Sequence, residues 1–205
     1  IADHSFFGCE SLTEVFLPPT IVSIGNYSFY KCIKLTTIEM LYTVASIGDY
    51  SFYRCESLVN INIPSSVVSI GNYAFYGCKS LVNINIPSSV VSIGSHAFFG
   101  CISIESISLP LSITSIEKLT FGGCSSMTKI DIFDSVTRID DYAFKDCSEL
   151  IEISIPSSVV YIGEGIFYGC SSLKNINIPP SITELKSSLY QYCISLTCFP
   201  FPKNS

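Results

Sequence analysis

The chain has 205 residues, of which 48% are hydrophobic and 14% charged, and its formal net charge is −6. Eleven basic residues are scattered among seventeen acidic ones, so the charge pattern excludes nucleic acid as the expected partner. No long apolar stretch runs without polar interruption, and no charged segment followed by an apolar run begins the chain, so the sequence predicts no membrane span in this chain.

A cysteine recurs nine times at an unbroken interval of 23 residues, from Cys9 to Cys193. A fixed period of this length, with apolar residues at a constant phase, is typical of a solenoid of stacked coils. The chain starts at the phase of a second extended segment, inside a coil. We therefore expect one solenoid over residues 1–205, as a fragment or a processed part of a longer protein.

The coil that starts at Cys55 shows the expected elements in order. Residues 58–63 fit a short strand with its apolar side inward, and Pro64 ends that strand because it has no N–H for the ladder. Residues 67–70 form a second extended segment, and Gly71 is expected to take the positive φ of a sharp turn. Ala74 and Phe75 predict a tight helical turn, with Phe75 in the interior.

Phenylalanine holds this interior phase in eight coils, and Tyr190 replaces it in the last. The proline is replaced by Leu41 and Phe133, and the glycine by Glu117, Asp140 and Lys186, so we expect altered backbones at these turns. The ninth strand would run from Cys198 to Pro200.

The recurring I-P-x-S-V-x-x-I-G-x-x-A-F-x-x-C pattern resembles the BspA-like leucine-rich repeats, from Ile1 to about Pro202. The resemblance implies an α/β solenoid, a right-handed coil of about nine 23-residue turns. A parallel β-sheet would lie on one face, with short extended or helical turns on the others. The resemblance also implies a place at the cell surface or outside the cell, and adhesion to matrix proteins or other cells.

Nine of the ten cysteines share one phase beside the phenylalanines, where a small apolar side chain fits. Stacked neighbours would have parallel Cβ vectors that do not converge as a disulfide requires, so we expect buried thiols. Cys198 lies at another phase and should face outward, either as a reactive thiol or as a tolerated surface residue. With no C-x-x-C pair and only two histidines, the sequence predicts no metal site.

Coils of equal length leave no insertion for the walls or lid of an active site, so we expect no enzyme and no cofactor. Glu14, Glu39, Asp131 and Glu152 occupy outward strand phases, and one interpretation is that carboxylates such as Asp131 and Glu152 approach each other across adjacent coils. The simpler interpretation is a set of solvated surface charges.

The outward strand phases are the candidate ligand-binding surface. The candidate residues are Asn60, Asn62, Asn83, Asn85, Lys129, Asp131, Glu152, Asn175 and Asn177. The asparagine amides both donate and accept hydrogen bonds, so this surface suits a peptide or glycan. The alternative is that the asparagines of adjacent strands bond to each other in ladders. Residues 117–152 carry twelve charged residues, which indicates either a partner-specific patch or simple drift from the repeat.

Tyrosines three residues apart, such as Tyr50 with Tyr53, should form a stripe on the side of the turns. The stripe suits protein contact, and packing between coils explains it equally. Asn26 begins an N-x-S sequon and is a candidate glycosylation site.

These observations favour a noncatalytic binding or adhesion module that recognises a protein or glycan ligand. The alternative is a structural block that self-associates into a fibre or surface layer. We expect a monomer or a weak, limited head-to-head dimer and no open fibre, because indefinite growth needs two complementary ends and Pro200 and Pro202 should discourage pairing at one of them.

Overall fold

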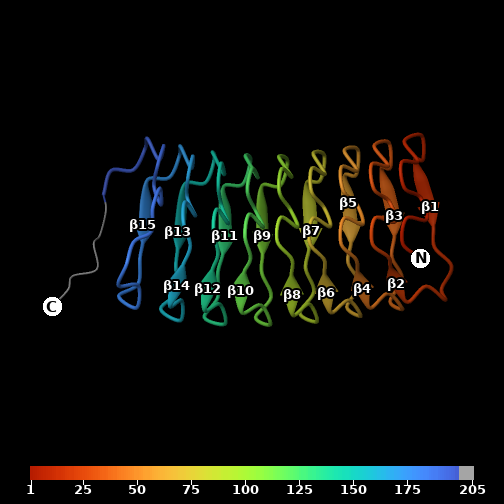
Figure 1. The fold of residues 1–205 in the computed structure, drawn as a ribbon, viewed down its shortest axis with the longest axis horizontal. Helices are drawn as coiled ribbons and strands as arrows, with labels where there is room; N and C mark the ends of the chain where they lie inside the picture. The colour runs from red at the N-terminus through yellow and green to blue at the C-terminus, as the bar shows by residue number, and fades with distance from the viewer. Residues whose placement is uncertain (199–205) are drawn as a thin grey trace.

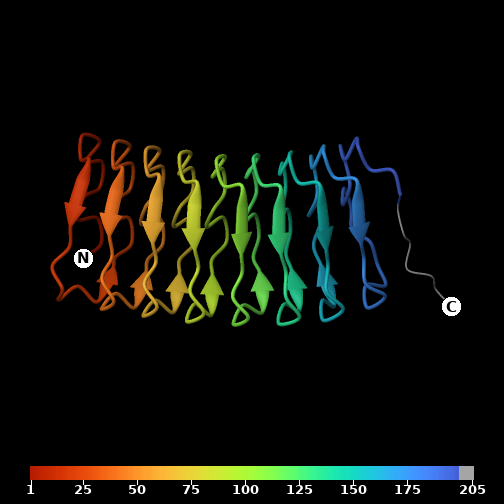
Figure 2. The ribbon, with the colours of Figure 1, turned by 180° about the vertical axis from the view of Figure 1, so that it is seen from behind.

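The computed structural model describes residues 1–198 and shows a rod of stacked coils, with β1 and β15 at opposite ends (Figures 1 and 2). Two columns of short parallel strands run along the rod on different sides, and a column of turns joins them. The solenoid predicted from the 23-residue period is therefore confirmed.

The first face carries eight three-residue strands within residues 1–198. They are β1 (Glu14–Phe16), β3 (Thr37–Glu39), β5 (Asn60–Asn62), β7 (Asn83–Asn85), β9 (Ser106–Ser108), β11 (Lys129–Asp131), β13 (Glu152–Ser154) and β15 (Asn175–Asn177). From β3 onward the middle residue is buried and its two neighbours are exposed. This alternation is what an extended chain with one buried side produces.

The second face carries seven two-residue strands in the same part of the chain. They are β2 (Ser23–Ile24), β4 (Ser46–Ile47), β6 (Ser69–Ile70), β8 (Ser92–Ile93), β10 (Ser115–Ile116), β12 (Arg138–Ile139) and β14 (Tyr161–Ile162). The isoleucine of each strand enters the core. Nine coils were predicted, but Cys198 is in no strand, and Pro200 lies outside the described residues.

The ladders are interrupted at particular places along the rod. On the first face β1, β3, β5 and β7 form one sheet, while β9 pairs only with β11 and β13 only with β15. On the second face β2 to β8 form one sheet and β10 to β14 another. Both faces therefore lose strand pairing between the coil of β7 and β8 and the coil of β9 and β10. We call this position the sheet break.

The turns before each cysteine are not helices, so the helical part of the prediction was wrong for residues 1–198. The N–H groups of Tyr73, Phe75 and Gly77 donate instead to carbonyls of the next coil at 2.7 to 2.9 Å. Positive φ values at Tyr73 (55°) and Gly77 (68°) turn these donors along the rod. The turns are thus a third column of contacts between coils.

The predicted phenylalanine column is confirmed. Phe29, Phe52, Phe75, Phe98, Phe121, Phe144 and Phe167 are fully buried, and successive rings stack with interplanar angles of 9° or less. Leucine, isoleucine and valine from both strand columns complete one continuous core along the rod.

Gly71 does not have the positive φ that its sequence suggested. Its Cα instead approaches the preceding coil so closely that a Cβ would lie 2.6 Å from the backbone N of Asp49. Gly94 has the same environment, at 2.5 Å from the N of Asn72. The repeat requires glycine here for close coil stacking.

Replacement of this glycine has two outcomes. Gly94 donates its N–H to Ile70 O at 2.9 Å, but Glu117 makes no equivalent bond to Ile93 O, and Lys186 makes none to Ile162 O. Asp140 keeps the bond, to Ile116 O at 2.8 Å. The expected change of backbone therefore occurs at residues 117 and 186 and not at 140.

Replacement of the proline leaves the turn intact. Val44 donates to Leu41 O and Val136 donates to Phe133 O, both at 3.0 Å, as Val67 does to Pro64 O. The prediction of altered backbones at these two turns was wrong, because the turn needs only the carbonyl of its first residue.

Candidate functional site

The exposed side of the first face is a row of polar side chains held by short, rigid strands. Each strand presents two outward residues, and the backbone pairing fixes their spacing along the rod. Sites built on strands are positioned more accurately than sites on loops. The sequence-predicted residues of this face all lie there and all are exposed.

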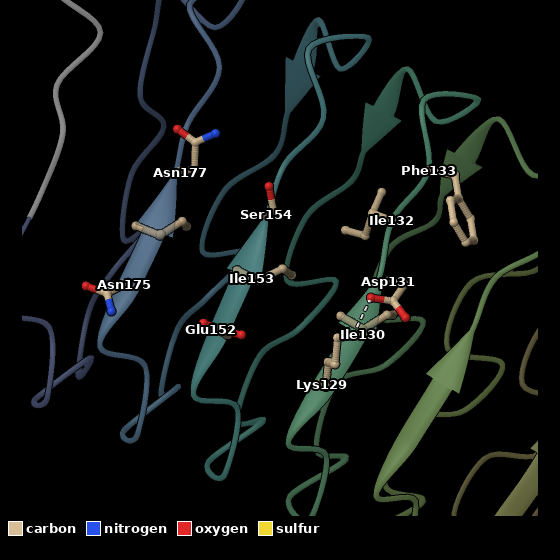
Figure 3. Close-up of a pocket in the computed structure, with 11 residues that line it drawn as sticks. Lys129, Ile130, Asp131, Ile132, Phe133, Glu152, Ile153, Ser154, Asn175 and Asn177 are labelled. Carbon is tan, nitrogen blue, oxygen red and sulfur yellow. Dashed lines mark ion pairs between the residues drawn. The ribbon is translucent and has the colours of Figure 1, made fainter.

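A shallow hollow of about 480 Å³ lies on this face over β11, β13 and β15 (Figure 3). Five predicted residues line it: Lys129, Asp131, Glu152, Asn175 and Asn177. The structure thus brings the charged and amide candidates of three successive coils into one place.

The hollow lies where β11 and β13 are adjacent without strand pairing. Lys129 Nζ and Asp131 Oδ1 form an ion pair at 3.0 Å along β11 (Figure 3). Glu152 occupies the next coil at the phase of Lys129 and makes no ion pair within the described residues. The approach of Asp131 to Glu152 considered from the sequence does not occur as a contact, since Asp131 is paired with Lys129.

Phe133 is the lining residue that the sequence interpretation missed. It occupies the proline position of the repeat, is 37% exposed and borders the hollow beside Ile132. An aromatic ring next to amides and carboxylates offers apolar contact together with directional hydrogen bonds. The departure from the repeat was visible in the sequence, but its position beside the hollow of the first face was not.

Asn60 and Asn62 line a second hollow, of about 400 Å³, at the opposite end of the same face. Asn83 and Asn85 lie on the next strand, in register with them. Within residues 1–198 no hydrogen bond joins the amides of these four residues, so the predicted asparagine ladder is absent from this face. All four amides are exposed.

A ladder of acidic and amide side chains does exist, on the second face. Asp49 N donates to Asn26 Oδ1, and Asn72 N donates to Asp49 Oδ1, each at 2.7 Å. Ser95 N continues the series to Asn72 Oδ1 at 2.9 Å. Each side chain caps the backbone of the following coil. The ladder occupies the position after the glycine in the regular coils, and of its members the sequence interpretation singled out only Asn26, as a glycosylation site.

Asn26 belongs to this ladder. Its side chain is exposed and contacts Asp3, with 3.4 Å from Nδ2 to Oδ2, while Ser28 of the sequon is buried. Glycosylation at Asn26 stays a prediction.

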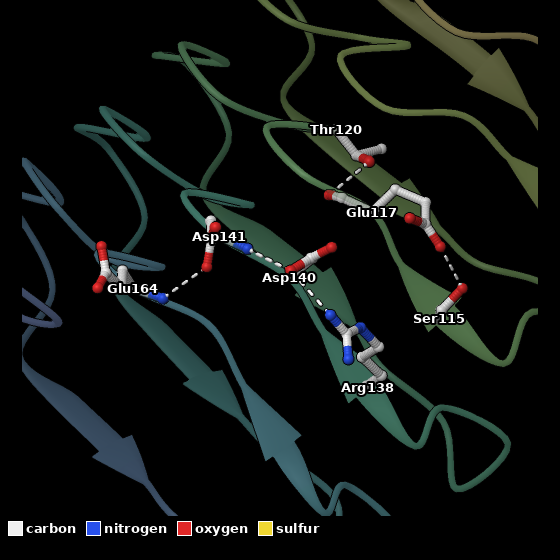
Figure 4. Close-up of polar contacts among 7 residues, drawn as sticks. All are labelled: Ser115, Glu117, Thr120, Arg138, Asp140, Asp141 and Glu164. Carbon is white, nitrogen blue, oxygen red and sulfur yellow. Dashed lines mark hydrogen bonds and ion pairs between the residues drawn. The ribbon is translucent and has the colours of Figure 1, made fainter. Parts of the chain in front are cut away.

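The ladder changes at the sheet break, where the side chains bond locally (Figure 4). Glu117 accepts a hydrogen bond from Ser115 Oγ at 2.6 Å, and Asp140 accepts one from Asp141 N at 3.0 Å and pairs with Arg138. Asp141 then caps Glu164 N at 2.9 Å, as in the regular coils. Asp140 and Asp141 therefore bond to backbone N–H groups, whereas Glu117 bonds to the side chain of Ser115.

The thiols are free and, from Cys32 to Cys170, buried. Each donates to a carbonyl of the preceding coil, as Cys78 Sγ does to Phe52 O at 3.2 Å. Burial raises the pKa of the Cys101 thiol to about 12, and the same cause raises that of Cys32 to about 12. The predicted burial of the repeated thiols is therefore confirmed from Cys32 to Cys170, but it was wrong for Cys9, which is exposed in the first coil of this chain. Cys198 is exposed, as predicted.

Within residues 1–198 no cluster of three or more histidine, cysteine or acidic side chains is arranged to hold a metal ion. In the same range no helix is long and apolar enough to cross a membrane.

Comparisons with known proteins agree with this geometry. The family described as BspA type leucine rich repeat region matches residues 1–125 and 91–205. The chain is similar to the crystal structure of the Treponema pallidum leucine rich repeat protein, at 30% identity and a TM-score of 0.65, over 85% of this chain and 71% of that one.

It is also similar to a leucine-rich repeat protein from Eubacterium ventriosum, at 26% identity and a TM-score of 0.65. That match covers 96% of this chain and 62% of the other, so this chain spans less than two thirds of that protein. No curated protein matches. From the repeat, the rod and these matches, the chain belongs to the BspA-type leucine-rich-repeat family.

Proposed function

We propose that the chain is a noncatalytic binding module of a surface or secreted protein, and that its first face holds a protein or glycan ligand. The hollow over β11, β13 and β15 is the centre of the proposed site. The observation that carries the proposal is the convergence of Lys129, Asp131, Phe133 and Glu152 there, on two successive coils that the repeat alone would make nearly identical.

The chemistry of the hollow supports reversible binding. Asn175 and Asn177 supply amide donors and acceptors, and Phe133 supplies apolar area at the rim. Binding sites combine a few placed polar groups with apolar lining in this way. Membership in a repeat family that the sequence resemblance associates with adhesion supports the location at the surface or outside the cell.

Replacing Lys129, Asp131 and Glu152 together by alanine tests the proposal. The purified variant should lose most of its binding to matrix proteins or glycans that the wild-type chain retains in a panel assay. Because all three side chains are exposed, its free energy of unfolding should stay within about 0.5 kcal/mol of wild type for each substitution.

The matched control replaces Lys118, Glu149 and Glu164, which have the same charges, are exposed and lie away from the first face. It should bind like wild type. If the Lys129, Asp131 and Glu152 variant binds as well as wild type, the binding site does not lie in the hollow.

A further inference from the structure

The side of the turns carries an aromatic surface over the first five coils. Ten rings form two columns, which we call the aromatic double column. The columns are His4, Tyr27, Tyr50, Tyr73 and His96, and Phe7, Tyr30, Tyr53, Tyr76 and Phe99. Successive rings of a column stand 4.3 to 5.0 Å apart and nearly parallel.

The backbone of the turns fixes these rings. Tyr27, Tyr50 and Tyr73 all have φ of 55°, and their N–H groups bond to the following coil at 2.8 to 2.9 Å. Within one coil the two rings are tilted, with centroids 5.6 Å apart for Tyr50 and Tyr53. The spacing of the rings is therefore imposed by the spacing of the coils.

Stacking covers the ring faces and leaves edges and hydroxyl groups outward. Within residues 1–198 the hydroxyls of Tyr27, Tyr30, Tyr50, Tyr53 and Tyr76 make no hydrogen bond, and Tyr73 contacts His96 Nε2 at 3.5 Å. The columns therefore offer no free ring face on which a partner could stack. They are complementary to a partner whose hydroxyl groups or ring edges repeat at the spacing of the coils.

The charges around the central coils of the double column are few. Glu56 pairs with Arg54 at 3.2 Å and with Lys79 at 3.0 Å, and Glu56 and Lys79 are the only charged residues from Cys55 to Gly100. The columns end at Leu119 and Gly122, where the charged coils begin. The aromatic surface thus borders no unpaired charge from Cys55 to Gly100, while Lys31 of an earlier coil lies with its Nζ 5.5 Å from the centre of the Tyr30 ring.

We propose that the aromatic double column is a docking surface for a second copy of this chain, in an antiparallel arrangement. A second copy carries the same ring spacing, so every coil of the column meets an equivalent coil of its partner. Tyrosine hydroxyls both donate and accept, which makes the surface complementary to itself about a two-fold axis.

The charge distribution selects the antiparallel arrangement. Residues 117–152 carry twelve of the chain's charged residues, seven of them acidic beyond Glu117. Two parallel copies would set these like-charged coils side by side, whereas an antiparallel pair places them at opposite ends of the dimer. Ten half-exposed rings on each copy bury on the order of 1,000 Å² in total, at the low end of specific interfaces. The dimer is therefore weak and forms at high protein concentration.

Sedimentation velocity from micromolar to millimolar concentration tests the association. We expect wild type to pass reversibly from monomer to dimer, and Tyr53→Glu to dimerise at least tenfold more weakly, because the substitution places like charges opposite each other. The control is Tyr168→Glu, at the same turn position outside the double column, which should dimerise as wild type does.

The antiparallel arrangement is tested on a chain that keeps all its aromatic residues. This second test therefore does not depend on whether Tyr53→Glu folds. Spin labels on Cys198 in a Cys9→Ser background should lie roughly 60 Å apart in the dimer, from thirteen coil steps of about 4.8 Å. Cys198 labels close to each other, a chain that stays monomeric at millimolar concentration, or a folded Tyr53→Glu that dimerises like wild type would each overturn the proposal.

Discussion

The two parts of the rod on either side of the sheet break differ in regularity. Up to Cys101 both strand columns form continuous four-stranded sheets, whereas from Ile102 to Cys198 the first-face strands pair only two by two. The distance between stacked core rings rises along the rod, from 5.0 Å for Phe6 and Phe29 to 6.2 Å for Phe167 and Tyr190. The same repeat therefore packs tightly in one part and more loosely in the other.

On the second face the loss of pairing coincides with a change of residue. A Cβ at Gly71 or Gly94 would lie against the backbone of the preceding coil, and Glu117 stands at this phase in the next coil, where the backbone bond is lost. The Cβ alone does not decide the bond, because Asp140 carries one and keeps it. On the first face no side chain explains the loss of pairing between β7 and β9.

The two parts also differ in surface. The tight part exposes stacked aromatic rings and few charges, and the loose part carries most charges and the larger first-face hollow. Regular coils thus repeat the same surface side chains from one coil to the next, whereas departures from the repeat give a surface whose side chains differ between coils.

The largest expected effect concerns the thiol column that both parts share. Because burial raises the pKa of these thiols, the unfolded chain ionises first as pH rises above about 9. The contribution of the buried thiols to the free energy of unfolding is fully present below that pH. Above it, the contribution falls by about 1.4 kcal/mol per pH unit for each thiol until the pH reaches the pKa of the folded state.

Urea unfolding with reductant present should therefore show a loss of several kcal/mol between pH 8 and pH 10. At neutral pH, without denaturant, only Cys9 and Cys198 should react rapidly with a thiol reagent, since Cys193 is partly buried. An unfolding free energy that is flat over this pH range would contradict the burial of the column.

A second prediction compares the core rings of the two parts. Phe75→Ala should destabilise by about 3 to 5 kcal/mol, the range for truncating a buried phenylalanine. Phe144→Ala should lie lower in that range, because its neighbours stand 5.8 and 6.0 Å away and the looser coils can relax into the space. Thermal or urea unfolding measures both.

Tyr76→Ala is the surface control and should cost about 0.5 to 1.5 kcal/mol, the contribution of lost ring stacking. A loss as large as that of Phe75→Ala would mean that inside and outside have been assigned wrongly.

The sequence was sufficient to predict the coil, its inward residues and the buried thiols, because each follows from a phase repeated many times. Gly71 shows the limit of that inference. Glycine is compatible with a positive φ or with a close approach, and only the position of Asp49 in the neighbouring coil distinguishes them. The expected helical turn failed for a similar reason, since the partners of Tyr73 N and Phe75 N lie one coil away.

For the candidate site, the sequence identified which side chains face outward and which coils are charged. It did not predict the hollow, because that depends on how the side chains of β11, β13 and β15 are arranged in space. The sequence also did not identify Phe133 as a residue of the site. Its exposure follows from the turn that Val136 N and Phe133 O close, and not from its own residue type.

A third prediction compares equivalent positions on either side of the break. Gly71→Ala should destabilise by about 1 to 3 kcal/mol, since its Cβ would meet the backbone at 2.6 Å. Glu117→Ala, where the backbone bond to the preceding coil is already absent, should change the free energy of unfolding by only about 0.5 kcal/mol. Similar losses at both sites would show that the close approach does not decide the stacking.

Amide hydrogen exchange resolved by residue tests the sheet break most directly. Val91 and Gly94 donate to the preceding coil at 2.9 Å, and Asp140 does so at 2.8 Å, whereas Thr114 and Glu117 have no such bond within the described chain. The amides of Thr114 and Glu117 should exchange at least about tenfold faster than those of the three bonded residues, the factor that corresponds to ~1.4 kcal/mol. Equal protection at all five amides would contradict the division of the rod into two parts.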